Sequence, residues 1–427
     1  MRYSLCLLVI ALAACRPSEP VAAPAEPPRS VQDPAPVAYA SEKQAFVVAE
    51  QVVGLDHPWS FAFLPDGGVL ITERPGRLRR VAPDGAVSAP ITGLPDIFVD
   101  GQAGLLDVAL SPDYARDGWI YLAFAEPNFR GNKAGTAVVR GKLRGDALVE
   151  PSVVYTQEPK LSHGTHVGAR LVFDDQGHLF VTQGDNRVGA ATAQELDKLS
   201  GKIVRIDADG KVPADNPFVS RAGARGEIWS YGHRNVQGAA LHPVTRQLWA
   251  TEHGPMGGDE LNIPQAGLNY GWPVITHGID YSGRPVPGSQ GTAAPGMEQP
   301  HHVWAKSPGL SGMAFYTGDA LPGWKGNLFL GALAAKALIR LELDGDRVVH
   351  EERLLTDRNQ RIRDVRQGPD GALYVLVDAP APDGKLLRIA PAPVPDAVTA
   401  PTAPTAPTAP TALAVLAVPA VPAAGAP

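Results

Sequence analysis

One pattern of apolar and polar positions recurs six times along the middle of the chain. Each copy has an apolar residue, a turn rich in Pro, Asp or Gly, and then alternating apolar residues, as in the segment FLPDGGVLI. The copies lie at 63–71, 110–122, 173–181, 241–250, 326–330 and 367–375. A turn followed by a period-two segment is typical of a hairpin that enters a β-strand. The pattern therefore predicts six strand-rich units.

Several units continue into a second alternating segment that carries charged residues, at 76–81, 201–206, 338–341 and 386–389. Few segments have helical periodicity, and 193–199 is the best short candidate. A strand-rich unit repeated every ~45–80 residues predicts an all-β fold, a six-bladed β-propeller with long inter-strand loops. The alternative is a pair of β-sandwiches, which the repeated unit disfavours.

The N-terminus has the composition of a targeting segment. Arg2 precedes a ten-residue apolar run that ends in Leu12-Ala13-Ala14-Cys15. That charge and length are typical of a secretory signal. Small residues before Cys15 resemble a bacterial lipobox, which predicts that Cys15 becomes the lipidated first residue of the mature protein. Ordinary cleavage near Ala14 is the alternative. Acylation would supply an anchor rather than a membrane span.

These patterns divide the chain into four parts. We predict a lipoprotein-type signal peptide at 1–14, a Pro/Ala-rich tether at 15–41, the β-propeller at 42–390 and a tail at 391–427. The tail repeats Pro-Thr-Ala and is predicted to be disordered. The predicted location is the periplasmic face of a membrane. Arg16, in place of an aspartate after the anchor cysteine, favours the outer membrane.

Composition narrows the classes of function. The 427 residues include 38 basic and 44 acidic side chains, a formal net charge of −6. A nucleic-acid-binding protein would need a basic surface, so no nucleic-acid partner is expected. Two cysteines cannot build a disulfide framework. No apolar run reaches the ~18–20 residues of a spanning helix.

Polar residues interrupt the strand pattern at five places. The first is Gln102, in a loop between Gly101 and Gly104, and it is a weak signal when taken alone. The second holds His163 and His166. Two histidines at this spacing could bind a metal, but no neighbouring Cys, Asp or Glu completes the ligand set. A catalytic base is the better functional interpretation, and Asp185, one hairpin later, could orient its imidazole. A structural histidine is the alternative, and it is the more common case for a single histidine.

The third place is Arg234-Asn235, which offers a planar cationic fork beside an amide. This pairing suits a planar acidic group that carries carbonyls, and a structural salt bridge is the alternative. The fourth is the loop 252–262, where a Gly-Pro turn exposes carbonyl oxygens and Asp259 and Glu260 add carboxylates. Hard oxygen ligands of this kind fit Ca²⁺ rather than zinc, and an acidic surface loop is the alternative.

The fifth place is basic and consists of Lys336 with Arg361 and Arg363. Alternate residues of a strand point to the same side, so the two arginines can converge on one anion. Two exposed strand residues are the alternative.

In this order, the five motifs resemble the soluble pyrroloquinoline quinone (PQQ) sugar dehydrogenases, and most closely the aldose sugar dehydrogenase branch of the glucose/sorbosone dehydrogenase family. The resemblance covers about 45–390 and implies a six-bladed propeller, in agreement with the six repeats. It also implies oxidation of an aldose at C1 to the lactone, with PQQ and Ca²⁺ as cofactors. Hydride would pass to PQQ, and the electrons would pass to a quinone, a cytochrome or an artificial acceptor.

The resemblance also implies a role for individual residues. His166 matches the catalytic base, and Asp185 matches the carboxylate that tunes it. The residues implied at the cofactor are Gln102, Arg234, Asn235, Lys336, Arg361 and Arg363. The carbonyls of Gly254 and Pro255 match the ligands of an active-site calcium, and Glu260 and Tyr270 match ligands of a second, structural calcium. Gln102 and Tyr281 match residues on the substrate side.

Two other functions remain open at this point. Calcium-dependent lactonases also use a six-bladed propeller, but they need no cationic cluster for a cofactor with several carboxylates. A non-enzymatic propeller that binds glycans or proteins is the third possibility. Fold alone does not determine function, so the choice among these three depends on site residues. Lys336, Arg361 and Arg363 favour the dehydrogenase, because they form the cationic cluster that the lactonases do not need.

Overall fold

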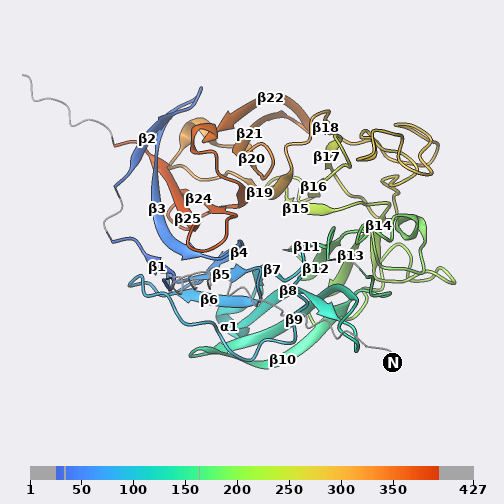
Figure 1. Cartoon of the computed structure of the whole chain (residues 1–427), viewed down its shortest axis with the longest axis horizontal. Coiled ribbons are helices and arrows are strands. Elements are labelled where there is room, and N and C mark those ends of the chain that lie inside the picture. The colour runs from blue at the N-terminus through green and yellow to red at the C-terminus, as the bar shows by residue number, and fades with distance from the viewer. Residues whose placement is uncertain (1–25, 33–34, 163, 394–427) are drawn as a thin grey trace, which may run out of the picture. The chain divides into compact units, whose positions relative to one another are not determined.

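The computed structural model describes residues 26–32, 35–162 and 164–393, which form six antiparallel sheets. The innermost strand of each sheet lies beside the innermost strands of the next and the previous sheet, around a common centre (Figure 1). These strands are β4 (Pro58–Phe63), β7 (Leu105–Leu110), β11 (Gly168–Phe173), β15 (Val236–Leu241), β19 (Leu310–Phe315) and β23 (Ile362–Gln367). The predicted six-bladed β-propeller is confirmed.

The six turns recognised in the sequence are the first hairpins of the six blades. Each leads into a second strand: β5 (Val69–Glu73), β8 (Trp119–Pro127), β12 (His178–Gln183), β16 (Leu248–Glu252), β20 (Leu328–Ala332) and β24 (Leu373–Val377). These strands are largely buried on both faces, and all five residues of β20 are buried. Burial on both faces follows from the packing of each blade between two others.

The outer strands complete the blades. They are β6 (Arg77–Val81), β9 (Ala134–Arg144), β10 (Ala147–Thr156), β13 (Lys202–Asp207), β14 (Ile228–Tyr231), β17 (Asp259–Asn262), β18 (His302–Trp304), β21 (Ala337–Asp344), β22 (Arg347–Leu354) and β25 (Gly384–Pro391). The four charged segments noted in the sequence are β6, β13, β21 and β25. They are therefore third strands, next to the buried second strands.

The N-terminal strand closes the ring. Strand β3 (Ala45–Leu55) pairs antiparallel with β25, for example Val48 with Ile389. Figure 1 shows β3, in blue, beside β24 and β25, in orange and red. One blade therefore combines both ends of the domain, and β25 presents no free edge to solvent.

The predicted tether at 15–41 is wrong for its C-terminal part. Strands β1 (Arg29–Ser30) and β2 (Val37–Ala40) pair antiparallel with β3. The rings of Tyr39 and Phe46 stack with centroids 5.4 Å apart. The free edge of β3 offers unpaired peptide groups, which accounts for this addition. The predicted signal peptide, Cys15 and all but the first residues of the predicted tail lie outside the described residues.

Helix is scarce in the described part of the chain. It consists of α1 (Tyr114–Asp117) and three 3-10 turns, η1 (Ala191–Gln194), η2 (Pro322–Trp324) and η3 (Thr356–Arg358). The helix predicted at 193–199 is therefore wrong, because Glu195 is already extended and Leu199 donates its N–H to the carbonyl of Glu158. No helix in the described ranges has the length and apolar character needed to cross a membrane.

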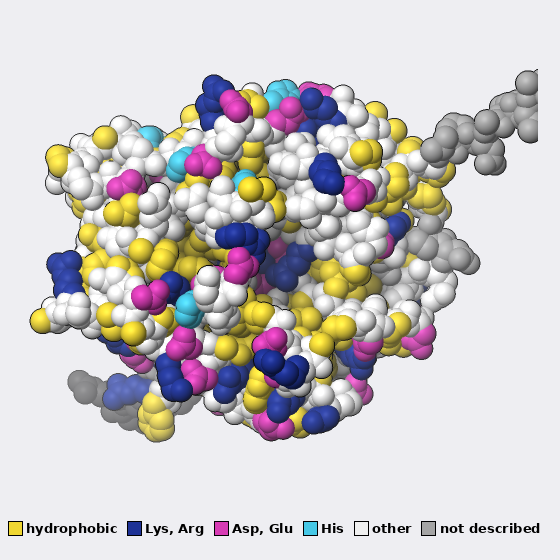
Figure 2. Space-filling view, turned by 180° about the vertical axis from the view of Figure 1, so that it is seen from behind, with side chains coloured by type: hydrophobic (Ala, Val, Ile, Leu, Met, Phe, Trp, Pro, Cys, Tyr) yellow, Lys and Arg dark blue, Asp and Glu magenta, His cyan; other side chains and the backbone are white. Residues whose placement is uncertain are grey.

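Buried charges join the blades along the central channel. Arg170 contacts Asp107 at 3.4 Å and Asp364 at 3.1 Å, and Arg366 contacts the same two carboxylates at 2.7 and 3.1 Å. The guanidinium of Arg170 also lies over the ring of Trp59, 4.2 Å from its centroid. Each buried charge is therefore compensated. Figure 2 shows one face of the molecule hollowed near its centre, where Lys, Arg, Asp and Glu side chains gather.

Candidate active site

A cavity of about 270 Å³ lies at the centre of the propeller. Its walls come from several blades, because the loops that enter the inner strands and the loops that leave the second strands converge there. Of the residues predicted from the sequence, it is lined by Gln102, His166, Arg234, Gly254, Pro255, Tyr281, Arg361 and Arg363. A second cavity of about 670 Å³ is lined by Asp107, Arg170, Asp364 and Arg366 among others. None of the site residues predicted from the sequence lines this second cavity.

A histidine–carboxylate pair occupies one wall of the first cavity. His166 Nδ1 lies 2.7 Å from Asp185 Oδ1, and both residues are buried. Because Asp185 is an acceptor, Nδ1 carries the proton and Nε2 keeps a free lone pair. The carboxylate also accepts the N–H of Arg187 at 2.7 Å and the indole N–H of Trp272 at 2.8 Å. This arrangement suits a general base.

The backbone at this histidine is strained. His166 has φ 51°, in the left-handed region that costs energy for a residue with a side chain. Its N–H donates to Gln102 Oε1 at 2.8 Å, and its carbonyl accepts the N–H of Asn186 at 3.2 Å. A Cβ at Gly184 would lie 1.8 Å from that carbonyl oxygen, so only glycine fits there. His163, the other half of the possible metal pair, lies outside the described residues.

Arginines form the opposite, cationic wall. Arg361 and Arg363 each place Nη2 3.1 Å from Asp378 Oδ2, so the predicted convergence on one anion is observed, with Asp378 as the anion. Burial would raise the pKa of Asp378, but Arg363, His57 and then Arg361 hold it well below its usual range. Asp378 therefore stays charged and orients both arginines.

The arginines of the cavity carry more positive charge than the single carboxylate of Asp378 can neutralise. Arg234 lies beside it and donates Nη1 to the carbonyls of His253 and Gly254, at 3.0 and 2.7 Å. The Nε atoms of Arg234 and Arg363 have no hydrogen-bond partner among the described residues. Unpaired donors on buried guanidinium groups fit a ligand with several carboxylates.

Two predicted cofactor residues do not line the cavity. Lys336 donates Nζ to Asn359 at 3.0 Å and is not among the residues of the wall. Asn235 is fully buried behind the wall, where its Oδ1 accepts the side-chain amide of Gln237 at 3.1 Å. Gln237 in turn accepts Nη1 of Arg363 at 3.0 Å. Asn235 therefore supports residues of the wall rather than forming it.

Sequence reasoning missed several residues of the site. They are Trp59, Arg74, Gln237, Ser307 and Asp378. Four of them stand apart from any motif in the sequence, whereas Gln237 lies only two residues after the Arg234-Asn235 motif. Asp378 follows the last residue of β24 directly, so the end of a strand was the available signal.

A small acidic site lies next to this cavity. Glu252, Glu260 and Tyr270 line a narrow space together with Arg234 and Trp272. Burial, and then the charge of Glu252, raise the pKa of Glu260 well above its usual value. Such crowding of carboxylates is relieved by a cation.

The donor atoms of this acidic site are oxygens. Asn262 donates Nδ2 to Glu252 at 3.1 Å and to Glu260 at 3.2 Å, while its Oδ1 has no partner among the described residues. The hydroxyl of Tyr270 donates to the carbonyl of Ile263 at 2.8 Å and is thereby engaged. Two adjacent carboxylates fit Ca²⁺.

The predicted carbonyl ligands lie in the cavity wall. Gly254 and Pro255 both line it, and Asp259 holds their loop by accepting the N–H of Gly254 at 3.1 Å and of Gly309 at 2.8 Å. The carbonyl of Gly254 also accepts a hydrogen bond from Arg234. A cation at Gly254 would therefore share this oxygen with the guanidinium group.

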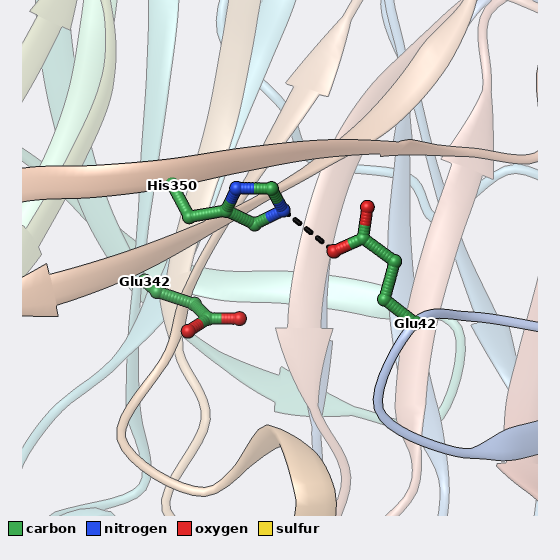
Figure 3. Close-up of side chains that lie close together, drawn as sticks. All are labelled: Glu42, Glu342 and His350. Atoms are coloured by element: carbon green, nitrogen blue, oxygen red, sulfur yellow. Dashed lines mark hydrogen bonds and ion pairs between the residues drawn. The ribbon is translucent and has the colours of Figure 1, made fainter.

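A separate cluster of possible metal ligands lies away from the cavity (Figure 3). Ligand atoms of Glu42, Glu342 and His350 lie within 4.8 Å of one another, and no other such group of three His, Cys, Asp or Glu occurs in the described ranges. Arg340 donates to Glu342 at 2.8 Å, and Lys43 contacts it at 3.1 Å. These cations neutralise the carboxylates, so the cluster joins the N-terminal segment to β21 and β22 by ion pairs.

A buried His–Asp pair that faces a cationic cavity in a six-bladed β-propeller is typical of an active site. Comparison with known families identifies the class of enzyme. The family model described as Glucose / Sorbosone dehydrogenase matches residues 55–388. The chain therefore belongs to the glucose/sorbosone dehydrogenase family, and the resemblance drawn from the motifs is confirmed. The expected enzyme class, an oxidoreductase that acts on CH–OH groups, is confirmed with it.

Individual relatives carry the same description. The aldose sugar dehydrogenase YliI of Escherichia coli K12 is 53% identical over 327 residues, which cover 76% of this chain and 88% of the relative. A crystal structure of the soluble aldose sugar dehydrogenase from Escherichia coli in the apo-form has a TM-score of 0.77 at 51% identity and covers 81% of this chain and all of the other. The PQQ-bound aldose sugar dehydrogenase from Streptomyces coelicolor has a TM-score of 0.65 at 28% identity, over 83% and 99% of the two chains.

Proposed function

We propose that this protein is a PQQ- and calcium-dependent dehydrogenase that oxidises aldose sugars at C1 to the lactone. The observation that carries the proposal is the His166–Asp185 pair beside a cavity walled by Arg234, Arg361 and Arg363. A structural relative titled as PQQ-bound supports the choice of cofactor. The alternatives, a lactonase-type hydrolase and a binding propeller, offer no reason for the cationic wall.

The cationic wall suits PQQ, which carries three carboxylates. Arg234, Arg361 and Arg363 would hold these groups, and Lys336, which bonds to Asn359 outside the wall, would add positive charge near them. Asn235 would act through Gln237, which positions Arg363. When bound, PQQ would supply the acceptor for the hydride, which carries both electrons of the oxidation.

The acidic site suits calcium. Glu252, Glu260 and Tyr270 would hold a structural Ca²⁺. The carbonyls of Gly254 and Pro255 would hold the active-site ion. When bound there, Ca²⁺ supplies a Lewis acid next to the acceptor.

His166 supplies the base of the reaction. Its Nε2 would take the proton of the C1 hydroxyl as the hydride leaves C1, and Asp185 would stabilise the resulting imidazolium through Nδ1. The sugar then becomes the lactone, which water opens to the aldonic acid. Gln102 holds the backbone of His166, and Tyr281, 64% exposed, stands at the rim where the sugar would enter.

The pH dependence of this base follows from its surroundings. Burial lowers the pKa of His166 below the ordinary 6.5, the bond to Asp185 opposes this, and the charge of Arg234 adds to the lowering. His166 must be neutral to accept a proton, so activity is lost only as the pH falls through this lowered pKa. We expect the acid limb of kcat/KM to lie below pH 6.5, and a profile of the holoenzyme from pH 4.5 to 8 measures it. A limb centred at pH 7 or above would contradict the assignment.

A dye-reduction assay tests the proposed function. Purified protein in Ca²⁺ buffer is given glucose and other aldoses, with and without added PQQ. We expect dye reduction only with PQQ, together with formation of the lactone. Hydrolysis of lactones without PQQ would favour the hydrolase. If the protein shows no turnover and does not shift the PQQ spectrum, the non-enzymatic binding propeller is favoured instead.

We also propose export and lipid anchoring at Cys15, with the outer membrane as the site of the anchor. The lipobox-like segment 12–15 and the apolar run before it support this. We expect the full chain in the membrane fraction and the Cys15→Ser variant outside it, as measured by fractionation of the cells that make it. Equal membrane retention of both would contradict the anchor.

A periplasmic quinone or cytochrome is the proposed electron acceptor.

A further inference from the structure

Trp272 connects parts of the site that lie far apart in the sequence. Its indole Nε1–H donates to Asp185 Oδ2 at 2.8 Å, in a buried bond that spans 87 positions of the chain. Its ring lies under the guanidinium of Arg234, 5.2 Å from the centroid. It also lines the acidic site of Glu252 and Glu260. Neither the sequence motifs nor the role proposed for His166 uses this residue.

The main chain of Trp272 is held on both sides, and its side chain is buried. The main-chain carbonyl of Trp272 accepts Gln194 Nε2 at 2.7 Å, and its main-chain N–H donates to the carbonyl of Gly232 at 2.9 Å. Gln194 belongs to η1, and Lys202 Nζ donates to the carbonyls of Thr192 and Ala193 in that turn and to the carbonyl of Ser200. These bonds fix the backbone from which the indole reaches Asp185.

The two oxygens of Asp185 have separate tasks. Oδ1 faces His166 Nδ1 and also accepts the N–H of Arg187, whereas Oδ2 accepts the indole of Trp272. Asp185 is 1% exposed, so water cannot replace a lost donor. A buried charged oxygen without a donor is costly, and a carboxylate freed at Oδ2 would turn toward other donors. That rotation would weaken the bond from Oδ1 to the imidazole.

We propose that Trp272 is a positioning residue that fixes the Asp185 carboxylate and so holds His166 in the tautomer with its proton on Nδ1. The free lone pair on Nε2 then faces the cavity at all times. Outer partners of this kind contribute roughly 10–100-fold to the function of the group that they orient. The kinetic consequence rests on the proposed function, whereas the tautomer itself is a property of the chain alone.

The test compares Trp272→Phe with a matched control. Trp324→Phe removes another buried indole, which donates to Ser41 at 3.1 Å near the N-terminal strand. Nitrogen-15 NMR of labelled histidines in the cofactor-free protein reports which ring nitrogen is protonated, with the His166→Gln variant assigning the signal. We expect the Nδ1–H tautomer in the wild type and Trp324→Phe, and averaged signals of both tautomers in Trp272→Phe.

Kinetics of the holoenzymes give the second readout. We expect Trp272→Phe to lower kcat about 10-fold, with KM for the sugar and the affinity for PQQ changed less than twofold. A retained Nδ1–H tautomer in Trp272→Phe would overturn the inference, whatever the activity. Failure of every variant to reduce dye would count against the proposed dehydrogenase activity and not against the role of Trp272. The NMR measurement of the His166 tautomer does not depend on turnover.

A variant that folds poorly does not end the test. In the wild type, the indole N–H of Trp272 should exchange slowly with solvent and shift when Asp185→Asn removes the charged acceptor. An indole signal that is unchanged by Asp185→Asn would contradict the bond on which the inference depends. The control signal is the indole of Trp324, which should be the same in both proteins.

Discussion

Replacement of His166 by alanine is expected to abolish sugar-dependent dye reduction while PQQ still binds. General-base catalysis contributes roughly 10²–10⁴-fold, so kcat should fall by at least that range. The residues proposed to hold the cofactor, Arg234, Arg361 and Arg363, do not hydrogen-bond to the imidazole, so the cofactor site persists. Dye reduction measures kcat, and a spectral titration measures the affinity for PQQ.

His178 provides a matched control for this experiment. It forms a similar pair with Asp174, with Nδ1 2.9 Å from Oδ2, but the pair lies on an outer turn away from the cavity. His178→Ala should keep wild-type kcat. Undiminished activity of His166→Ala would remove His166 from the mechanism, and a loss of PQQ binding in the same variant would make it a cofactor ligand instead.

Removal of calcium is expected to inactivate the enzyme completely. Glu252 and Glu260 place two carboxylates side by side, and this acidic site adjoins the cavity through Arg234, His253 and Gly254. A chelator should therefore abolish dye reduction. Ca²⁺ together with PQQ should restore it, whereas PQQ alone should not. Recovery with PQQ alone after complete removal of calcium would contradict the metal requirement.

The acidic site can be examined apart from turnover. A ligand that binds only the folded protein at 100 times its Kd stabilises it by about 2.7 kcal/mol, so Ca²⁺ should raise the Tm of the cofactor-free protein. Glu260→Gln should remove most of this increase. Glu342→Gln, in the ion-pair cluster with Glu42 and His350, is the control and should leave it intact. An equal response of both variants to Ca²⁺ would exclude Glu260 as a ligand.

The propeller was predictable because its signal is local and repeated. Each first hairpin places a turn before a buried second strand, and this unit is written six times within short segments of the chain. The N-terminal pairing was not predictable in the same way. Strand β2 has little buried surface, and it forms because the edge of β3 is available to it.

The residues of the site also differ in whether the sequence could predict them. Residues in motifs, such as His166 and Asp185, or alternate arginines on a strand, such as Arg361 and Arg363, were found because neighbours in the sequence pointed to them. Lys336 was assigned to the cofactor by resemblance, yet its side chain bonds to Asn359 outside the wall. The position of Lys336 in the sequence did not show in which direction its side chain would point.

The sequence by itself determined the sixfold repeat, the first hairpin of each blade and the residue types that carry the chemistry, because hydrophobic periodicity and turn residues act over short distances. Only the tertiary structure decided that Asp378 orients both arginines, and that Trp272 holds the carboxylate of Asp185. Asp378 meets the arginines because β23 and β24 pair within one blade, whereas Trp272 and Asp185 lie 87 positions apart, after strands of neighbouring blades. The second contact depends on the packing of one blade against the next, where burial makes a missing hydrogen bond costly.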